Sequence, residues 1–276
     1  MNNNYNYQPK HFFSIVFIFT WLFWIGAIAL ENNGLKFFIM LLGLFVPAVT
    51  ALYLIFSSKN PGLKRDLKIK LFSFKRVKLP YVLLAIIMIF VVVTVSILLS
   101  TFFGQSLNQF SFTEDYSFSI GGVSTLITLV ITAIVEELGW RSYAVDSLAN
   151  SYNWFKTSLI FGFIWSLWHV PLFFISDTYQ AGVLQQSPWF MVSFLVGIVP
   201  FAIIFTWVYI KNNRSILACM FFHFFTNLTQ EGVAMTQVTK AVETLVFIVA
   251  AVIILFLNKD LFFSKNHIGK LPDNID

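Results

Sequence analysis

The sequence has few charged residues, and their scarcity excludes a water-soluble fold. Asp, Glu, Lys and Arg make up 11% of the 276 residues, whereas a soluble domain carries about 25%. Hydrophobic residues make up 58% of the chain. Because no water-soluble fold of this size could bury so much apolar surface, we expect an all-α membrane protein. Its apolar runs are long enough for membrane-spanning helices rather than for the strands of a barrel.

Cysteine is almost absent as well. The single Cys219 excludes an internal disulfide and a metal site built from several cysteines. It lies in an apolar run, which predicts a buried structural thiol. The sequence also lacks a His-Glu-x-x-His pair, the arrangement by which one helix provides two zinc ligands. Any metal would therefore need ligands from separate segments.

Eight apolar stretches are long enough to cross a bilayer, which takes roughly 20 residues of helix. We place them at residues 12–30, 37–56, 81–103, 121–143, 155–175, 189–210, 215–230 and 241–257. The fourth and seventh are the least apolar because they carry polar residues. Since there is no internal repeat and no soluble domain, the sequence predicts a single helical domain over residues 1–276, with a disordered tail at 258–276.

The basic residues are distributed unevenly among the connections. The connection 57–80 contains eight bases and one acid, Asp66, whereas the connection 104–120 contains two acids and no base. If both termini are cytoplasmic, every base except Lys36 and Lys240 lies on the cytoplasmic side, as the positive-inside rule requires. The basic residues that give the net charge of +5 then orient the chain in the membrane, and we expect them to contact anionic lipid headgroups. Nucleic-acid binding is not expected.

Two adjacent glutamates, Glu136 and Glu137, stand in the fourth stretch and are followed by Arg141. Charged groups at membrane depth cost a few kcal/mol each, so they persist where they have a partner or a function. Glu137 and Arg141 are four residues apart and share a helix face, so we expect Arg141 to neutralise Glu137. Glu136 points elsewhere, and an unpaired carboxylate can take a proton from water. The alternative is a structural ion pair between two helices.

Further polar residues lie in the fifth and seventh stretches. His169 follows Trp165 by one helical turn, and His223 shares a face of a Phe-rich helix with Asn227. Two donors on one face suit a developing oxyanion. Each group alone would also serve as a polar contact between helices. Together with the glutamates they supply a base, a proton carrier and oxyanion donors, which predicts a hydrolytic reaction at membrane depth.

The predicted spans put the first two of these groups at different depths. Glu136 lies near the cytoplasmic end of the fourth helix, and His169 lies past the midpoint of the fifth, toward the outside. The two side chains meet only if the fifth helix starts deeper or if the helices tilt or kink. Pro171 offers one means, because proline disturbs a helix.

The polar residues form three motifs, which are Glu136-Glu137-x-x-x-Arg141, Trp165-x-x-x-His169 and His223-x-x-x-Asn227. Their order and spacing resemble those of the CPBP family, the CAAX-processing and bacteriocin-processing intramembrane proteases, also called the Abi family. The resemblance covers roughly residues 121–230. The second motif of the family is usually Phe-x-x-x-His, so Trp165 departs from it, and we expect the indole to keep the packing role.

The resemblance implies an intramembrane endopeptidase with eight membrane helices. Glu136 would activate water together with His169, and the third motif, His223 and Asn227, would support the oxyanion. Structural roles would fall to Glu137, Arg141 and Trp165. Glu136, His169 and His223 would also suit a zinc site with one open position, so the cofactor is either none or a single Zn²⁺.

Two other functions fit the same polar residues. A proton-coupled transporter uses buried Glu and His as proton relays, but such proteins usually contain repeats that this sequence lacks. The other is a non-catalytic scaffold of the same fold, for example an immunity protein. For a protease, the expected partners are the bilayer and a membrane-associated peptide or protein, which the motifs do not identify. The Asn-, Lys- and Phe-rich composition suggests an AT-rich genome, and hence a multi-pass protein of a bacterial plasma membrane.

Overall fold

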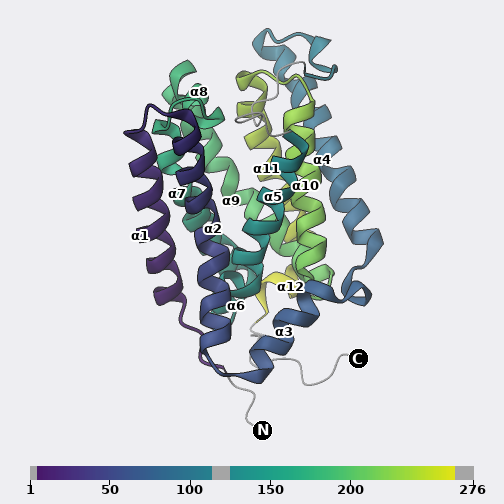
Figure 1. Cartoon of the computed structure of the whole chain (residues 1–276). Coiled ribbons are helices and arrows are strands. Elements are labelled where there is room, and N and C mark those ends of the chain that lie inside the picture. Colours follow the sequence, from purple (N-terminus) through teal and green to yellow (C-terminus); the bar gives the residue numbers. More distant parts are fainter. Residues whose placement is uncertain (1–4, 114–124, 265–276) are drawn as a thin grey trace.

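The computed structural model describes residues 5–113 and 125–264, and within these ranges the chain forms a bundle of helices (Figure 1). The longer helices are α1 (Pro9–Ile28), α2 (Asn33–Ser57), α4 (Leu79–Ser100), α5 (Thr125–Gly139), α7 (Trp154–Trp168), α9 (Pro188–Lys211), α10 (Ile216–Gly232) and α11 (Gln237–Leu257). The shorter helices are α3 (Pro61–Phe72), α6 (Val145–Ala149), α8 (Tyr179–Gln186) and α12 (Lys259–Phe263). The tight 3-10 turns are η1 (Phe74–Arg76), η2 (Thr101–Phe103), η3 (Leu107–Gln109) and η5 (Val170–Phe174), and η4 (Trp140–Ala144) is a π turn. The predicted all-α class is confirmed.

Six helices in the described part of the chain are long and apolar enough to cross a membrane. They coincide with the first, second, third, fifth, sixth and eighth predicted stretches. The fourth and seventh stretches correspond to α5 and α10, the helices that carry the glutamates and the His223 motif. Residues 121–124 of the fourth stretch lie outside the described residues.

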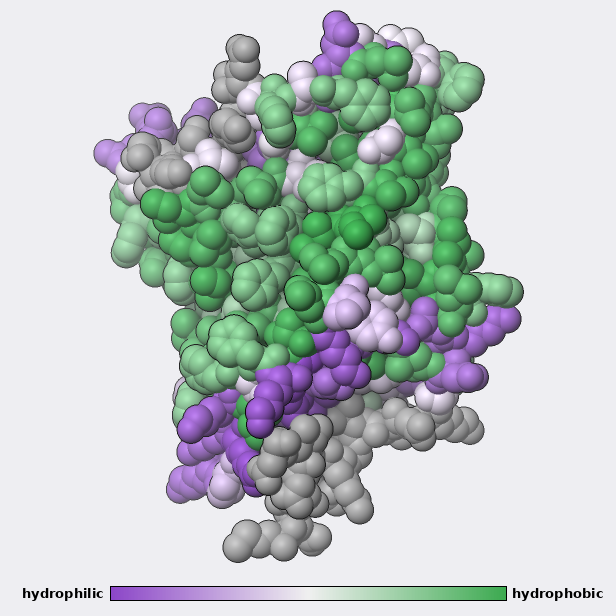
Figure 2. All heavy atoms as spheres, turned by 90° about the vertical axis from the view of Figure 1, so that its right-hand side faces the viewer, coloured by the Kyte–Doolittle hydropathy of each residue, from purple (hydrophilic) through white to green (hydrophobic). Residues whose placement is uncertain are grey.

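The face of the molecule shown in Figure 2 carries a broad apolar belt between two more polar ends. On α4, for example, Leu83, Ile87 and Phe90 remain about half exposed. Such side chains suit contact with lipid tails, and the helical backbone satisfies its own hydrogen bonds. The distribution is that of a multi-pass membrane protein.

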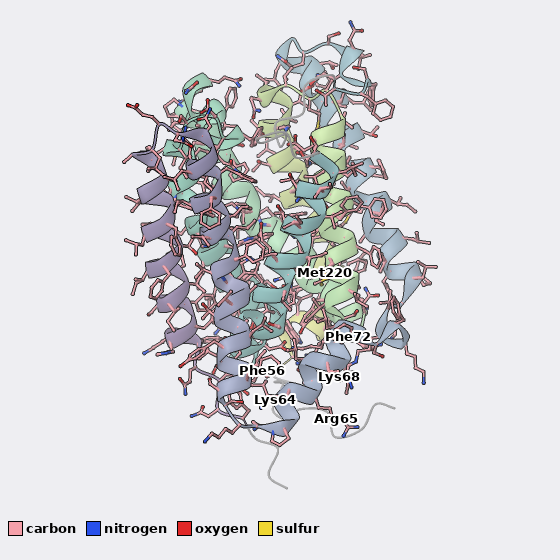
Figure 3. All side chains as sticks on the ribbon, in the orientation of Figure 1. Phe56, Lys64, Arg65, Lys68, Phe72 and Met220 are labelled. Atoms are coloured by element: carbon pink, nitrogen blue, oxygen red, sulfur yellow. The ribbon has the colours of Figure 1, made fainter. Side chains whose placement is uncertain are left out.

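The connection 57–80 forms α3 at one end of the bundle, where Lys64, Arg65 and Lys68 follow one another along the helix (Figure 3). The helix begins at Pro61 because the Asn60 side chain accepts a hydrogen bond from the Leu63 N–H, and proline needs no donor at the first helical position. Lys68 is exposed. Lys70 is fully buried, so the prediction that the bases of this connection face lipid headgroups is wrong for Lys70.

The short helix α12 corrects the prediction of a disordered tail at 258–276. Residues Lys259–Phe263 are helical, and Phe262 is fully buried. The ring of Phe263 lies 4.8 Å from that of Phe155, at the start of α7. These apolar contacts order the segment, and residues 265–276 lie outside the described residues.

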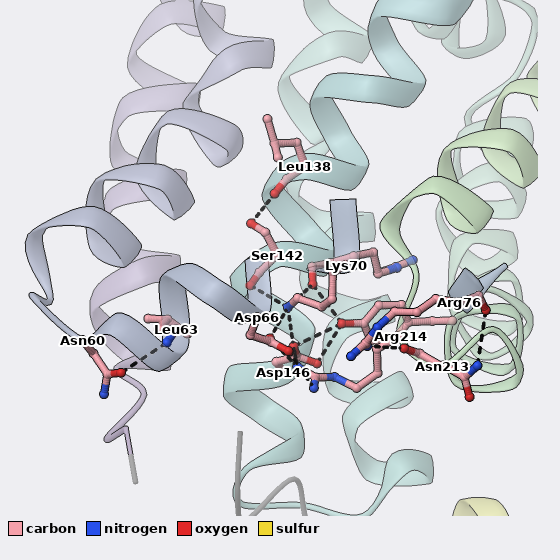
Figure 4. Close-up of polar contacts among 12 residues, drawn as sticks. Asn60, Leu63, Asp66, Lys70, Arg76, Leu138, Ser142, Asp146, Asn213 and Arg214 are labelled. Atoms are coloured by element: carbon pink, nitrogen blue, oxygen red, sulfur yellow. Dashed lines mark hydrogen bonds and ion pairs between the residues drawn. The ribbon is translucent and has the colours of Figure 1, made fainter. Parts of the chain in front are cut away.

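A buried cluster of charges joins α3 to the rest of the bundle (Figure 4). Lys70 Nζ lies 3.0 Å from Asp66 Oδ2 and 2.7 Å from Asp146 Oδ2 of α6. Arg214, between α9 and α10, lies 2.8 Å from Asp66 Oδ2 and also pairs with Asp146. Two cations thus compensate two carboxylates, which is what burial of charge requires.

This cluster predicts a loss of stability in acid. Burial raises the pKa of Asp66, but the charges of Lys70 and Arg214 outweigh it and lower the pKa from 3.8 to about 2. A carboxylate with a lowered folded-state pKa stabilises the fold above its unfolded-state pKa, and the contribution is lost as the pH falls through the folded-state value. We therefore expect the unfolding temperature in detergent to drop between about pH 4 and pH 2, by an amount equivalent to about 2 kcal/mol.

The comparison is with Asp66→Asn, which should be less stable than wild type at pH 7 and should show a smaller drop in this pH range. Asp260→Asn removes an exposed carboxylate and serves as the control. Equal pH dependence of wild type and Asp66→Asn would contradict the prediction.

Candidate active site

The glutamates lie on a longer helix than the sequence predicts. α5 continues through η4 into α6, so the helical run extends from Thr125 to Ala149. Glu136 is 13 residues before the end of this run, and His169 is 15 residues after the start of α7 at Trp154. At about 1.5 Å per residue, both residues lie about 20 Å along their helices from the short α6–α7 connection. Glu136 and His169 therefore lie at similar depths along their helices, and no kink is needed to bring the two side chains together.

Gly139 allows α5 to pack closely against α2. A Cβ atom at this position would lie 2.7 Å from the carbonyl carbon of Pro47 and 2.8 Å from the Ala48 nitrogen. Backbone atoms cannot yield as a side chain can, so a larger residue would displace one helix. This close approach sets the position of both glutamates in the bundle.

Two indoles bind the carboxylate of Glu136. Trp165 Nε1 donates to Oε2 at 3.0 Å, and Trp140 Nε1 donates to the same oxygen at 3.3 Å. An indole N–H can only donate, so both contacts favour an accepting carboxylate. Trp165 thus does more than pack, and its departure from the usual phenylalanine adds a hydrogen-bond donor. Trp140 was not predicted, although its position four residues after Glu136 is visible in the sequence.

A cavity of about 310 Å³ lies beside Glu136. Trp165, His169 and Asn227 also line it, so predicted residues from α5, α7 and α10 meet at one cavity. Most of the remaining lining is apolar or aromatic. The lining continues to Tyr179 at the start of α8 and to the first turn of α11, at the end of the bundle opposite α3 (Figure 1). The cavity is of the size and character of a ligand site, roughly 300–1,000 Å³ and mostly apolar.

The imidazole of His169 has one nitrogen fixed by the backbone. Its Nδ1 lies 2.6 Å from the carbonyl oxygen of Trp165. Because a carbonyl only accepts, Nδ1 carries a hydrogen, and in the neutral ring Nε2 then has the free lone pair. His169 can therefore act as a proton acceptor toward the cavity.

Glu137 points away from Glu136 and connects two other polar residues. Its Oε2 lies 3.1 Å from Arg141 Nε, which is the contact that the spacing predicts, and its Oε1 lies 3.0 Å from His223 Nδ1. The Arg141 guanidinium lies between the rings of Phe161 and Phe205, at 4.8 and 5.0 Å from their centroids. The contact with His223 was not predicted, because it depends on how α10 packs against α5.

The predicted zinc ligands do not form a ligand set in the described residues. Among residues 5–113 and 125–264, no group of three or more His, Cys, Asp or Glu side chains is placed to hold a metal ion. His223 directs Nδ1 to Glu137 and is not part of the cavity lining that Glu136 and His169 share. The three predicted ligands are therefore not brought together as a zinc site among the described residues.

Comparison with known proteins identifies the family. The family model described as "Type II CAAX prenyl endopeptidase Rce1-like" matches residues 119–229, a range that contains all three motifs. "CAAX prenyl protease 2" of Methanococcus maripaludis is 42% identical over 270 residues, which cover 96% of this chain and 99% of the relative. The chain therefore belongs to the Rce1-like family of type II CAAX prenyl endopeptidases and is an intramembrane endopeptidase.

Proposed function

We propose that this chain hydrolyses a peptide bond near the C-terminus of a prenylated, membrane-associated protein. The name of the relative supports this substrate class. The observation that carries the proposal is the carboxylate of Glu136 on the wall of a largely apolar cavity, together with His169 and Asn227. An apolar cavity suits a lipid-modified segment and limits access of bulk water. Family membership favours proteolysis over the transporter and scaffold alternatives.

The proposed first step is attack by a water molecule on the scissile carbonyl carbon. Both indoles bind Oε2 of Glu136, so the other carboxylate oxygen is available to a water in the cavity. Glu136 takes a proton from this water as the C–O bond forms, and Nε2 of His169 is the second proton acceptor at the cavity. A base positioned in this way typically contributes about 10²- to 10⁴-fold to the rate.

The resulting tetrahedral intermediate carries an oxyanion. Asn227 lines the cavity, and its amide N–H₂ can donate to that oxygen. We assign His223, one helical turn earlier on α10 and bound to Glu137, to the support of the same charge. When the C–N bond breaks, the proton held by Glu136 passes to the leaving amine. The products are a released C-terminal peptide and a new carboxyl group, which gives the second proton of the water to Nε2 of His169 and becomes a carboxylate.

A reporter peptide with a prenylated cysteine three residues before its C-terminus tests the proposal. In proteoliposomes, the wild-type protein should release the C-terminal tripeptide, detected by mass spectrometry. His169→Ala should lose this activity, whereas His11→Ala, which changes an exposed histidine of α1, should retain it. An intact reporter after incubation with wild type, or wild-type turnover by His169→Ala, would reject the proposal.

We also propose that the chain crosses the bilayer eight times with both termini in the cytoplasm. The start of α1 and the helix α12 lie at the same end of the bundle as α3 (Figure 1), whose connection carries eight bases and one acid. The two crossings beyond the six apolar spans would be the run Thr125–Ala149 and α10, which is 17 residues long. The α-helical segments of these two crossings, α5 with 15 residues and α10 with 17, are shorter than the six apolar spans, which have 20 to 25 residues.

Accessibility of single cysteines tests this orientation. In a Cys219→Ser background, an impermeant maleimide should label Asn108→Cys, in η3, in intact cells and Lys68→Cys only after lysis. Both positions are exposed in the structure. The opposite labelling pattern would invert the topology. It would also place the Tyr179 end of the cavity, which lies at the end of the bundle opposite α3, in the cytoplasm.

A further inference from the structure

We propose that Lys70 and Tyr209 are positioning residues for catalysis, because they bind the π turn that directly follows the two glutamates. Neither residue belongs to the three motifs, and neither lines the cavity beside Glu136. The inference rests on the proposed function, since it names residues that act on the same site.

The π turn η4 sets the direction of two side chains that bind the glutamates. It covers Trp140–Ala144, and the Val145 N–H bonds to the Trp140 carbonyl, five residues earlier. Trp140 donates to Glu136, and Arg141 pairs with Glu137. Such wide turns are rare, occur mostly as single turns inside α-helices and are frequent at functional sites. A change in the turn would therefore move both contacts together.

Two side chains from distant parts of the chain bind the carbonyl groups of this turn. Lys70 Nζ, from α3, donates to the Arg141 carbonyl at 3.3 Å and to the Ser142 carbonyl at 3.1 Å. Tyr209 OH, from α9, lies 3.0 Å from the Arg141 carbonyl oxygen and 3.1 Å from both carboxylate oxygens of Asp146, so its single hydrogen is shared between the π turn and the charge cluster. Both side chains are fully buried. Buried backbone carbonyls require partners, and here the partners come from outside the helix.

The charge of Lys70 is compensated by the cluster of Figure 4, in which it contacts Asp66 and Asp146. Burial of charge costs several kcal/mol, and replacement of a whole buried ion-pair cluster by apolar residues of similar volume is often neutral or stabilising, whereas removal of one partner is destabilising. Attachment of α3 alone therefore does not require a charged cluster at this place. An ammonium group does what an apolar side chain cannot, since it donates hydrogen bonds to two adjacent carbonyl groups of the π turn.

The contacts form two short connections from the π turn to the site. One runs from Arg141 through Glu137 to His223, with atom separations of 3.1 and 3.0 Å. The other runs from Trp140 to Glu136 at 3.3 Å. We infer that loss of the Lys70 or Tyr209 hydrogen bonds loosens the general base and the residue that supports the oxyanion, and leaves the substrate cavity in place. The turnover number, kcat, should then fall, and KM should stay close to the wild-type value.

The test compares Lys70→Met and Tyr209→Phe with matched controls in the reporter assay. Lys68→Met removes an exposed lysine from the same helix, and Tyr152→Phe removes a hydroxyl from a partly exposed tyrosine. We expect kcat to fall about tenfold in Lys70→Met and about threefold in Tyr209→Phe, with KM within about twofold of wild type. Both controls should keep the wild-type constants.

Hydrogen exchange of the peptide that covers residues 138–146 gives a second readout, and it should be faster in both variants than in their controls. Lys70→Arg keeps a donor and should recover part of kcat. If Lys70→Met does not fold, Tyr209→Phe decides the question, because it removes one hydroxyl group and little volume. Assays run well below the unfolding temperature separate a loss of stability from a loss of turnover.

The outcomes distinguish this inference from the proposed function. If wild type cleaves the reporter and both variants keep wild-type kcat, the positioning role is wrong and the proposed function stands. The same holds if the variants only unfold at lower temperature. If wild type does not cleave the reporter at all, the proposed function fails, and the positioning role fails with it.

Discussion

Glu136→Gln is expected to lower kcat by about a thousandfold while KM and the unfolding temperature stay close to those of wild type. The glutamine amide has nearly the same size as the carboxylate, and its carbonyl oxygen can still accept the two indole hydrogen bonds that Glu136 Oε2 accepts. What it lacks is the ability to take a proton from water. The loss should therefore fall on the chemical step alone, measured as single-turnover release of the tripeptide from the prenylated reporter.

The control for this result is Glu31→Gln, which neutralises an exposed glutamate near the start of α2. It should leave both constants unchanged. Turnover by Glu136→Gln at the wild-type rate would remove Glu136 from the mechanism, and with it the general-base step. A loss of activity together with a much lower unfolding temperature would instead indicate a structural role for the carboxylate.

Arg141→Met is expected to lower the free energy of unfolding by about 3–5 kcal/mol. The substitution keeps a long apolar side chain between Phe161 and Phe205 but removes the cation that lies 3.1 Å from Glu137. Glu137 is fully buried, so its charge would then lack its ion-pair partner in a low-dielectric environment. Denaturant titration in detergent, followed by circular dichroism, measures the change.

The double variant Glu137→Gln with Arg141→Met should recover much of this loss, because it removes the buried charge together with its partner. Lys68→Met, at an exposed position, should change the stability little. If the double variant is as unstable as Arg141→Met, the cause is the lost stacking of the guanidinium on the two rings, and not the uncompensated carboxylate.

Contacts between residues close in sequence could be predicted, because helix geometry alone determines them. The pair Glu137 and Arg141 follows from a spacing of four residues, and the shared face of His223 and Asn227 follows in the same way. The depth of Glu136 was misplaced because η4 and α6 extend the helix beyond the apolar stretch. Hydropathy detects the apolar part of a helix and does not detect its polar continuation.

The sequence by itself determined the membrane class, the helical periods and the three polar motifs, because these depend on composition and on the spacing of neighbours along one helix. Only the tertiary structure decided that Trp165 binds Glu136, that Glu137 binds His223 and that Lys70 lies buried under the π turn. The residues in these contacts are 29 to 86 positions apart in the chain. Their geometry follows from how the helices pack, for example from the close approach of Gly139 to Pro47. Residue spacing along the chain carries no information about that packing.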